Sequence, residues 1–510
     1  MKYFPLCFVT LLAFASCQKQ EAAPGAAANP ETPAAQAAVL ADPIHSVVRI
    51  NATQQGWNPA QPWEKASPSN RRALAAIVGP QRVLTTSEMV ADSTYLELES
   101  PDGTRLLPAK VLAVDYEANL ALLGPQADDK NAKSFFDGTS PLAVAGPPSI
   151  GDIFELLQVE ENGSSLTTQG TLRQVTVSST FLPGQFFLTF VVKASMQSAS
   201  SSFSLPTLRN GKLVGILASY DSKEQTCQVI STDIITRFLG AAAKGSYQGF
   251  PSLGLATATT EDAPFRRWLK LPENDGGLYV SLVRKGGSAE AAGVKPGDVL
   301  TGIGDHIVDR RGYYHHERYG NLYWSNLVRG ERLAGESVKL HLLRDGKPLD
   351  LDAKLAREET SARLVPSYTF DSAPSYLVKG GLVFQELTQP LLESFGENWE
   401  SQAPLNLLDA ARNQDKHKGN ARRVVFLTGG IPTPATVGYE RLRNLIVSKV
   451  NGREILDMKS MVEAFQHPDK GLHRVEFEDE TISIYLDDAV TSHVDQMLQQ
   501  RGISPLYRAQ

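Results

Sequence analysis

The residues that could do nucleophilic chemistry gather in a serine-rich run at residues 195–204. A serine hydroxyl acts as a nucleophile when a base lies within hydrogen-bond reach, most often a histidine that a carboxylate orients. Of the nine histidines, only His45 precedes residue 306. His45 is expected in the first predicted strand, before the run VVRI, with a structural or surface role. The serines therefore indicate either a nucleophile without a histidine base or simply a flexible loop.

Metal and thiol chemistry have weaker support. The run His-His-Glu at residues 315–317 has ligand-type side chains, but adjacent side chains on an extended segment point to opposite faces. No third ligand is evident, so we expect a solvated loop there, and we expect no cofactor. The chain has three cysteines, Cys7, Cys17 and Cys227, too few for a disulfide framework or a four-thiolate zinc site. Cys227 is expected to be a buried or inert thiol.

Length and charge narrow the class of protein. The 510 residues indicate about three domains at roughly 150 residues each. Apolar residues make up 42% and charged residues 21%, the balance of a folded protein with real cores. Lys and Arg number 50 and Asp and Glu 56, a net charge of −6. A protein that binds nucleic acid carries a basic excess, so no nucleic-acid partner is expected.

The first 17 residues have the pattern of a secretory signal. Lys2 is followed by an apolar stretch at residues 3–16 that is too short to span a membrane, and small residues precede a break. The break, Phe-Ala-Ser-Cys, ends at Cys17 and resembles the lipobox of bacterial lipoproteins, with Phe14 in place of the usual Leu. That resemblance implies a lipid on the Cys17 thiol. The alternative is a plain secretory signal with an incidental cysteine.

The segment after Cys17 favours the lipoprotein. Residues 21–42 contain ten Ala and three Pro and almost no large apolar side chain, so they cannot bury enough surface to fold. We expect residues 18–42 to be a flexible tether between a lipid and a folded body. The expected location is the bacterial cell envelope, at the periplasmic face of a membrane. Gln18, rather than Asp, slightly favours the outer membrane.

Three blocks follow the tether. Residues 43–245 contain short β-branched or alternating runs separated by Gly, Pro, Asp and Asn, which predicts a β-barrel or sandwich. Residues 246–360 give a strand GGLYVSLV, a small helix SAEAAG that Ser288 can cap and Gly293 can end, and a strand VLTGIG. Residues 361–510 repeat this scheme loosely, since KVNGREI parallels GIGDHIV.

These blocks resemble the HtrA/Deg family of trypsin-like serine proteases with PDZ domains. The runs VLTTSEMV and PAKVLAVDYEANLALL resemble the stretches that carry the catalytic His and Asp of that family, and NGKLVGILASY resembles the strand after its catalytic Ser. Residues 276–308 resemble a PDZ domain, and the last block resembles the divergent second PDZ domain of plant-type Deg proteases. The resemblance implies a mainly β chain: a trypsin-like double β-barrel at 43–245, then PDZ (α+β) domains at 246–360 and 361–510.

The catalytic pattern of the family is degenerate in this chain. The position of the His holds Glu88, and that of the Asp holds Asn119. The family's Gly-Asn-Ser-Gly-Gly falls on residues 200–204, so Ser202 keeps the type of the nucleophile but has lost every flanking glycine. Those glycines allow backbone conformations that aim N–H groups at the oxyanion. Glu88 itself is a poor base for a hydroxyl, because a carboxylate with a pKa near 4 is not basic enough unless it is desolvated.

Peptide binding is the function that the pattern retains. A PDZ domain adds an extended peptide to a sheet edge and holds its terminal carboxylate in a nest of backbone N–H groups. Gly254 fits that nest, and Leu253 and Leu255 fit the apolar pocket beside it. The alternative is that this run is only the first strand of a closed, self-occupied module. The second PDZ-like block shows no equally clear carboxylate loop, so ligand binding and scaffolding remain open for it.

Two functions of different class follow. The first is a lipid-anchored pseudoprotease that binds peptides or the C-termini of envelope proteins as an adaptor, scaffold or holdase. The second is a working serine endopeptidase with an altered catalytic group. The resemblance also implies a homo-oligomer, a trimer or larger.

Overall fold

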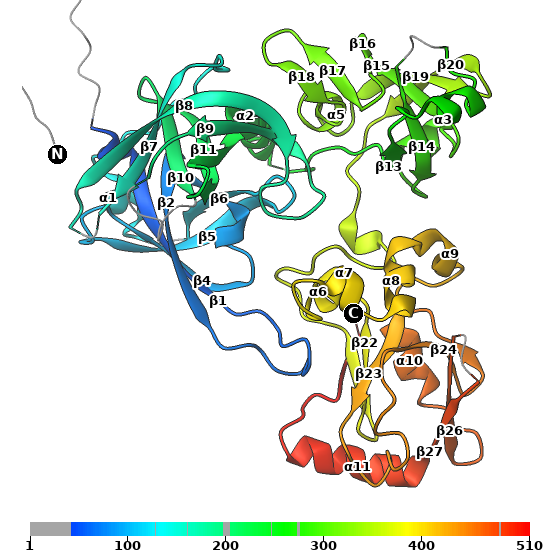
Figure 1. Cartoon of the computed structure of the whole chain (residues 1–510). Coiled ribbons are helices and arrows are strands. Elements are labelled where there is room, and N and C mark those ends of the chain that lie inside the picture. The colour runs from blue at the N-terminus through cyan, green and yellow to red at the C-terminus, as the bar shows by residue number, and fades with distance from the viewer. Residues whose placement is uncertain are drawn as a thin grey trace, which may run out of the picture. The chain divides into compact units, whose positions relative to one another are not determined.

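The computed structural model describes residues 42–509 except 128, 161, 197–203, 246, 273–275 and 479–480 (Figure 1). The lipobox with Cys17, the tether up to residue 41, Ser202 and most of the serine-rich run therefore lie outside the described residues. No described helix is both long enough and apolar enough to cross a membrane.

The first sheet is a closed six-stranded barrel with the order β1-β2-β3-β6-β5-β4. Its strands are β1 (Val47–Gln54), β2 (Ser69–Gly79), β3 (Arg82–Thr85), β4 (Ser93–Glu99), β5 (Leu106–Asp115) and β6 (Leu120–Pro125). Alternating apolar side chains, such as Val48 and Ile50 of β1, point into the barrel and form its core with Ile77 and Leu98. A short helix, α1 (Ala132–Phe136), adds Phe135 to this core.

The second sheet is also a closed barrel, with the order β10-β11-β12-β9-β8-β7. Its strands are β7 (Ile153–Val159), β8 (Ser165–Ser178), β9 (Phe187–Lys193), β10 (Leu205–Arg209), β11 (Lys212–Asp221) and β12 (Thr226–Ser231). The helix α2 (Thr232–Ala242) follows directly, and the Ser231 hydroxyl caps it by accepting from the Ile234 N–H. The two closed barrels confirm the predicted double β-barrel.

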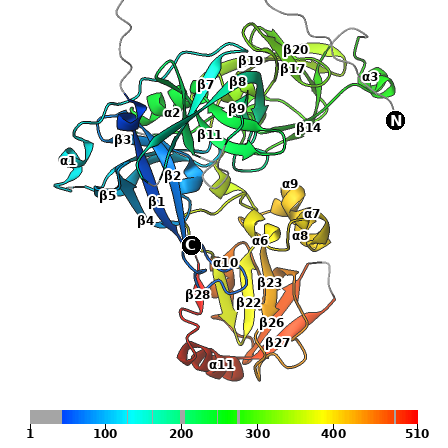
Figure 2. The ribbon, with the colours of Figure 1, turned by 60° about the vertical axis from the view of Figure 1, so that its left-hand side comes forward.

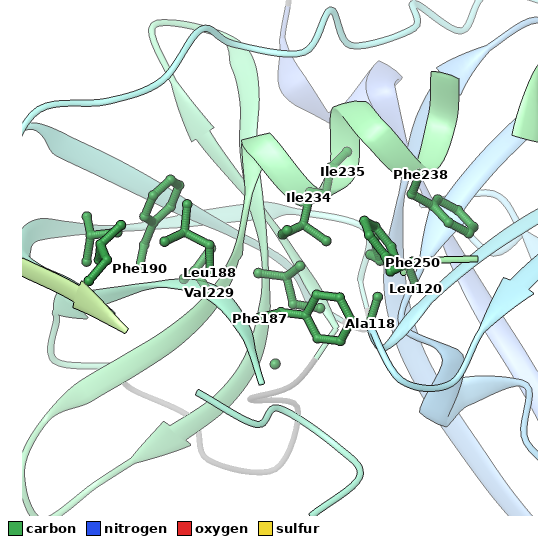
Figure 3. Packing of buried hydrophobic residues seen from close by; sticks show 14 of the residues in the cluster. Ala118, Leu120, Phe187, Leu188, Phe190, Val229, Ile234, Ile235, Phe238 and Phe250 are labelled. Carbon is green, nitrogen blue, oxygen red and sulfur yellow. The ribbon is translucent and has the colours of Figure 1, made fainter. Parts of the chain in front are cut away.

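One apolar core joins the two barrels, and Figure 3 shows part of it. Ala118 and Leu120 come from the first barrel, Phe187 and Val229 from the second, and Phe238 from α2. All of these residues are buried. Because this core lies beside the segment that leads to Asn119, packing between the barrels fixes where that residue sits.

Residues 247–356 form the first C-terminal module, a sheet with the order β13-β14-β15-β19-β20. Its strands are β13 (Leu255–Ala258), β14 (Leu278–Val283), β15 (Val299–Ile303), β16 (His306–Ile307), β19 (Ser337–Arg344) and β20 (Lys347–Lys354), with a separate hairpin of β17 (Tyr313–His316) and β18 (Gly320–Tyr323). Its helices are α3 (Ala263–Trp268), α4 (Ser288–Ala292) and α5 (Asn326–Arg329).

Three local predictions need correction. Ser288 is the first residue of α4 rather than its cap, and its hydroxyl donates to the Ser252 carbonyl instead; Gly293 ends the helix as predicted, with a φ of 91°. His45 lies in a 3-10 turn, η1 (Pro43–Ser46), because Pro43 opens a turn before the strand. The run at 315–317 is expected to be a solvated loop: His315 and Glu317 are exposed, but β17 extends to His316, so the run enters a β-hairpin.

The second C-terminal module has an eight-stranded sheet with the order β27-β26-β24-β23-β22-β21-β28, and β25 pairs with β24. Figure 2 labels β22, β23, β26, β27 and β28 of this sheet. Its strands are β21 (Tyr376–Lys379), β22 (Leu382–Glu386), β23 (Val425–Gly430), β24 (Leu445–Val450), β25 (Arg453–Glu454), β26 (Leu472–Phe477), β27 (Ser483–Asp487) and β28 (Tyr507–Arg508). Its helices are α6 (Gln389–Glu393), α7 (Trp399–Gln402), α8 (Leu405–Arg412), α9 (Gln414–Lys418), α10 (Met458–Ala464) and α11 (Asp488–Gln500). The turn between β24 and β25 matches the turn between β15 and β16, as the sequence parallel predicts.

Candidate functional site

Glu88 and Asn119, the residues at the family's His and Asp positions, lie side by side. Glu88 is in a single 3-10 turn, η2 (Ser87–Met89), just after β3, and Asn119 directly precedes β6, the strand that pairs with β3. The Asn119 Oδ1 accepts hydrogen bonds from the Ser87 hydroxyl and from the Glu88 backbone N–H, both at 3.1 Å. Asn119 is fully buried and has a φ of 55°, a conformation that Asn tolerates better than most residues.

The Glu88 carboxylate is engaged by a cation of the barrel. Its Oε1 lies 2.6 Å from the Arg71 Nη2, and the Glu88 carbonyl accepts from the Gln54 side chain at 2.8 Å. Arg71 is in β2 and Gln54 ends β1, and these two strands pair with each other. Glu88 is therefore held by side chains from two neighbouring strands. Glu88 is therefore placed as an ion-pair partner of Arg71.

Ser204, directly before the second barrel's strand β10, contacts the segment that leads to Glu88. It lies two residues after Ser202, and its hydroxyl is 2.8 Å from the Thr85 Oγ1 and accepts from the Thr86 N–H at 3.3 Å. Ser204 is buried and has a φ of 52°, in the left-handed region that favours glycine. Thr86 leads directly into η2, so the start of β10, Glu88 and Asn119 converge between the barrels. Ser202 and Phe203 lie outside the described residues.

The loop before Asn119 is tied down by groups that sequence reasoning missed. The Asp115 carboxylate accepts from the Ala118 N–H and from the Tyr247 hydroxyl, both at 2.8 Å. The Glu117 carboxylate forms an ion pair with Arg329 of α5. Burial raises the pKa of Glu117, while the Arg329 charge opposes this rise. An acidic residue two positions before Asn119 is a weak sequence signal, because the sequence does not show which distant cation it meets.

A segment between the two C-terminal modules also lies against this loop. The Phe370 ring stacks on Phe181 with centroids 5.4 Å apart and tilts against Tyr116 at 4.7 Å. Asp371 and Asp92 each accept the backbone N–H of the other, at 3.0 and 2.9 Å. Burial raises the pKa of Asp92, and the Asp371 carboxylate adds to this effect. These contacts meet the chain close to the candidate site, because Asp92 is four residues after Glu88 and Tyr116 is three residues before Asn119.

The predicted peptide-binding residues lie at the start of β13. Leu253 is buried, Leu255 is half-buried and opens β13, and Gly254 between them has a φ of 71°. A Cβ on Gly254 would meet ordinary contacts at 3.4 Å or more, so the backbone angle rather than space requires glycine there. The Gly254 N–H donates to the Ser252 hydroxyl at 3.1 Å.

Two further features lie beside these residues. Within the described residues β13 pairs only with β14, so its other side is a sheet edge. Arg284 directly follows β14, and its backbone N–H donates to the Gly254 carbonyl at 2.9 Å. Its guanidinium lies 3.3 Å from the Glu358 carboxylate. A cation beside the predicted carboxylate loop suits an anionic peptide end.

The remaining candidate groups are the Cys227 thiol, possible metal ligands and His45, and they belong neither to the Glu88–Asn119 site nor to the residues at the start of β13. Cys227 is buried in β12, and burial raises the pKa of its thiol to about 12. The described residues contain no group of three His, Cys, Asp or Glu side chains placed to hold a metal ion. His45 lines a cavity of about 460 Å³ together with Asp102, Arg105 and Phe135, and neither Glu88 nor Asn119 lines it.

Comparison with known proteins gives one family and several relatives. The family model "PDZ domain" matches residues 365–506. Protease Do-like 2, chloroplastic, of Arabidopsis thaliana is 25% identical over 466 residues, which is 90% of this chain and 74% of the relative. Protease Do-like 4, mitochondrial, of the same plant is 23% identical over 423 residues, or 82% of this chain and 76% of the relative.

Solved structures with a similar fold include an HtrA-type protease AlgW with decapeptide, at 19% identity and a TM-score of 0.45, covering 62% of this chain and 96% of that one. The serine endoprotease from Yersinia pestis is 18% identical with a TM-score of 0.41, covering 64% of this chain and all of that one (100%).

Proposed function

Because this chain is a homologue of the HtrA/Deg family of trypsin-like proteases and carries a PDZ domain, we propose that it binds peptides without cleaving them. In this proposal it is a pseudoprotease of the bacterial envelope that acts as an adaptor, scaffold or chaperone-like holdase. Its ligands are exposed peptides or the C-termini of unfolded envelope proteins.

The observation that carries the proposal is the arrangement of Glu88, Asn119 and Arg71. A serine nucleophile needs a base whose free lone pair faces the hydroxyl and a carboxylate that orients the base. Here the group at the position of the base is a carboxylate in an ion pair with Arg71, at 2.6 Å. The group at the position of the orienting carboxylate is a neutral amide whose oxygen accepts from the Glu88 main chain. This arrangement supports a structural role for both residues.

The conformation of Ser204 gives further support. The family places a glycine there, and Ser204 keeps the left-handed backbone angle that glycine would adopt, at a cost of roughly 1–2 kcal/mol for an L residue. Its hydroxyl is bonded to the Thr85 side chain. A residue that holds this left-handed angle and uses its hydroxyl in a buried hydrogen bond is consistent with a position kept for the fold.

The binding half of the proposal rests on the first C-terminal module. An edge at β13 and a positive-φ glycine before it are features that β-strand addition with carboxylate capture uses, and the nearby Arg284, paired with Glu358, adds a cation beside them. In the proposal Gly254 forms the carboxylate nest and Leu253 and Leu255 line the adjoining apolar site.

The cellular part of the proposal rests on sequence alone. A lipid on Cys17 and the tether at 18–42 would hold the folded body at the periplasmic face of a membrane, and the barrels would assemble it into a homo-oligomer of three or more copies.

The proposal is tested by combining capture with a search for cleavage. The body from residue 43 onward is incubated with envelope extract, bound proteins are recovered, and their C-terminal peptides are displayed on an array. We expect selective binding to peptides with apolar C-termini and no new cleavage products by mass spectrometry. New products that vanish in Ser202→Ala would instead establish the endopeptidase, and the absence of selective binding would remove the peptide-binding role.

A further inference from the structure

A cavity of about 720 Å³ lies in the second C-terminal module, beside the face of the sheet that carries α6 and α8. Figure 1 shows these helices next to β22 and β23. The apolar side chains that line the cavity include Leu391 of α6, Phe395, Pro404 and Phe426 of β23. Leu391 and Phe395 pack against the buried cluster that contains Phe426, so the core of the module holds this wall in place. The volume is typical of sites that bind small molecules, about 300–1,000 Å³.

A further wall of the cavity comes from the loop between β1 and β2, through residues 58–60. The buried side chain of Gln385 in β22 donates from its Nε2 to the Pro59 carbonyl at 2.9 Å. Within the loop, the Asn58 Oδ1 accepts from the Ala60 N–H at 3.0 Å. These bonds connect the loop to the sheet, so two segments far apart in the sequence line one cavity.

The charge of the lining is unbalanced. Of the 13 described residues that line the cavity, Arg443 alone is charged. Within the part of the chain that the structure describes, no hydrogen bond, ion pair or ring contact engages its guanidinium. A guanidinium is always charged in proteins, and its planar fork of donors matches the two oxygens of a carboxylate. The cavity therefore offers one unpaired cation to an anion, and no carboxylate of the lining competes for it.

Arg443 is held at the cavity by the residue that follows it. The Asn444 N–H donates to the Leu427 carbonyl at 2.6 Å, and the Asn444 carbonyl accepts from the Asn406 side chain of α8 at 2.8 Å. The backbone beside Arg443 is therefore fixed between β23 and α8. The neutral amides of Gln402 and Asn444 also line the cavity, and such groups bond ligand oxygens without adding charge.

We propose that this cavity is a binding site for a small molecule that joins one carboxylate to an apolar chain, such as a medium-chain fatty acid. Arg443 takes the carboxylate, and the apolar side chains beside α6 cover the chain. A single cation among neutral groups favours one negative charge and disfavours a cationic or polyanionic ligand. The site is separate from the peptide site proposed at Gly254, and the inference does not depend on that function.

Isothermal titration of the full chain with sodium decanoate tests the site. We expect saturable binding at one site per chain, with a dissociation constant below ~1 mM. Octanoate and hexanoate should bind more weakly, by about three- to fourfold for each methylene removed. 1-Decanol, which lacks the anion, and decyltrimethylammonium, which has the opposite charge, should bind at least tenfold more weakly than decanoate. Absence of saturable decanoate binding, or equal binding of the cationic amphiphile, would overturn the proposal.

Substitutions at two neighbouring arginines separate the cation of the cavity from the general charge of the surface. R443M removes the guanidinium but keeps an apolar stem, and it should weaken decanoate binding at least tenfold. R443K keeps the charge without the planar fork, so its affinity should lie between those of R443M and the unaltered chain. R441M is the matched control, because Arg441 is also exposed but does not line the cavity. We expect R441M to bind as the unaltered chain does, and equal affinities of R443M and R441M would contradict the site.

Hydrogen exchange locates the ligand. Saturating decanoate should slow exchange at the amides of Ala60 and Asn444, which lie in the two segments that meet at the cavity, and not at Leu255. G254V should leave decanoate binding unchanged, so failure of the proposed peptide site and failure of this one are distinguishable. Loss of decanoate binding in G254V, or protection confined to Leu255, would place the ligand in the first module and refute the inference. An apolar-ended peptide that binds through Arg443 while decanoate does not would also refute it, since the cavity would then take chain ends rather than small molecules.

Discussion

The guanidinium of Arg329 and the carboxylate of Glu117 form an ion pair between α5 of the first C-terminal module and the loop that leads to Asn119. Both side chains are largely buried, with 13% and 5% of their surface exposed. Arg329 also donates to the Gln185 side chain at 2.6 Å and lies 4.9 Å from the Phe187 ring centroid. A residue of the first module thus fixes the segment two positions before Asn119.

Replacing Arg329 with Met should destabilise the chain strongly. The change leaves the Glu117 carboxylate buried without its cation, which costs about 3–5 kcal/mol in comparable buried pairs. Burial already raises the pKa of Glu117. A carboxyl whose folded pKa is raised adds stability below its unfolded pKa and loses it as the pH rises. The loss in R329M, measured by urea unfolding, should therefore be smaller at pH 5 than at pH 7.

The control for this variant is R311M. Arg311 lies 3.9 Å from Glu261, and both side chains are about 60% exposed (64% and 59%), so removing that pair should change stability by less than ~1 kcal/mol. Equal small losses in R329M and R311M would contradict the importance of the Glu117 pair.

Two variants of Ser204 separate its backbone angle from its hydroxyl. Both S204A and S204G lose the hydrogen bonds to Thr85 and Thr86, but only glycine adopts the φ of 52° without strain. S204G should therefore be more stable than S204A by roughly 1 kcal/mol in thermal or urea unfolding. If S204A is the more stable variant, the left-handed angle is not a source of strain.

Restoring the two altered triad positions should not restore a protease. The double variant E88H/N119D supplies a base and an orienting carboxylate, yet casein hydrolysis should stay near background. The loop would still lack its glycines, and removal of a single oxyanion donor from a working protease already costs about 10²–10³ in rate. Adding glycine at positions 200, 203 and 204 should then raise hydrolysis above the double variant. Efficient cleavage by the double variant alone would show that the oxyanion loop is intact.

The fold and part of the site could be predicted from the sequence. Strand patterns and the family resemblance give the double barrel, and the pairing of β3 with β6 makes Glu88 and Asn119 neighbours. Ser204 stands where the family has a glycine, and this indicates the positive φ that the residue adopts. The contacts of Arg329 with Glu117 and of Phe370 with Phe181 and Tyr116 could not be predicted, because each joins residues more than 180 positions apart and leaves no local periodicity. Ser288 was misplaced by one residue because helix ends are set by the tertiary contacts of the hydroxyl.

The predicted groove of the first module is tested with G254V. Valine disfavours the φ of 71° and crowds the backbone N–H groups, so binding of an apolar-ended peptide should weaken about tenfold or more in isothermal titration. The matched variant G335V also places valine at a positive φ, 95°, with open space around the new side chain. Equal affinities for G254V, G335V and the unaltered chain, all folded by circular dichroism, would remove Gly254 from the site.

The predicted lipid anchor is tested with C17S. This change removes the thiol that would be lipidated, so the protein should appear in a soluble or uncleaved form instead of the membrane fraction. C7S, which alters a cysteine inside the predicted signal, should keep the wild-type distribution. Membrane fractionation that is unchanged in C17S, with no lipid on the wild-type protein by mass spectrometry, would contradict the anchor.

The central claim, that no activated serine remains between the two barrels, is tested most directly by a fluorophosphonate probe. Such a probe reacts with a serine hydroxyl that a base has activated, and it needs no knowledge of the substrate. The folded chain should show no more labelling than S202A over the time in which a working serine protease is fully labelled. Labelling of the wild-type chain that disappears in S202A would establish an active nucleophile and contradict the pseudoprotease assignment.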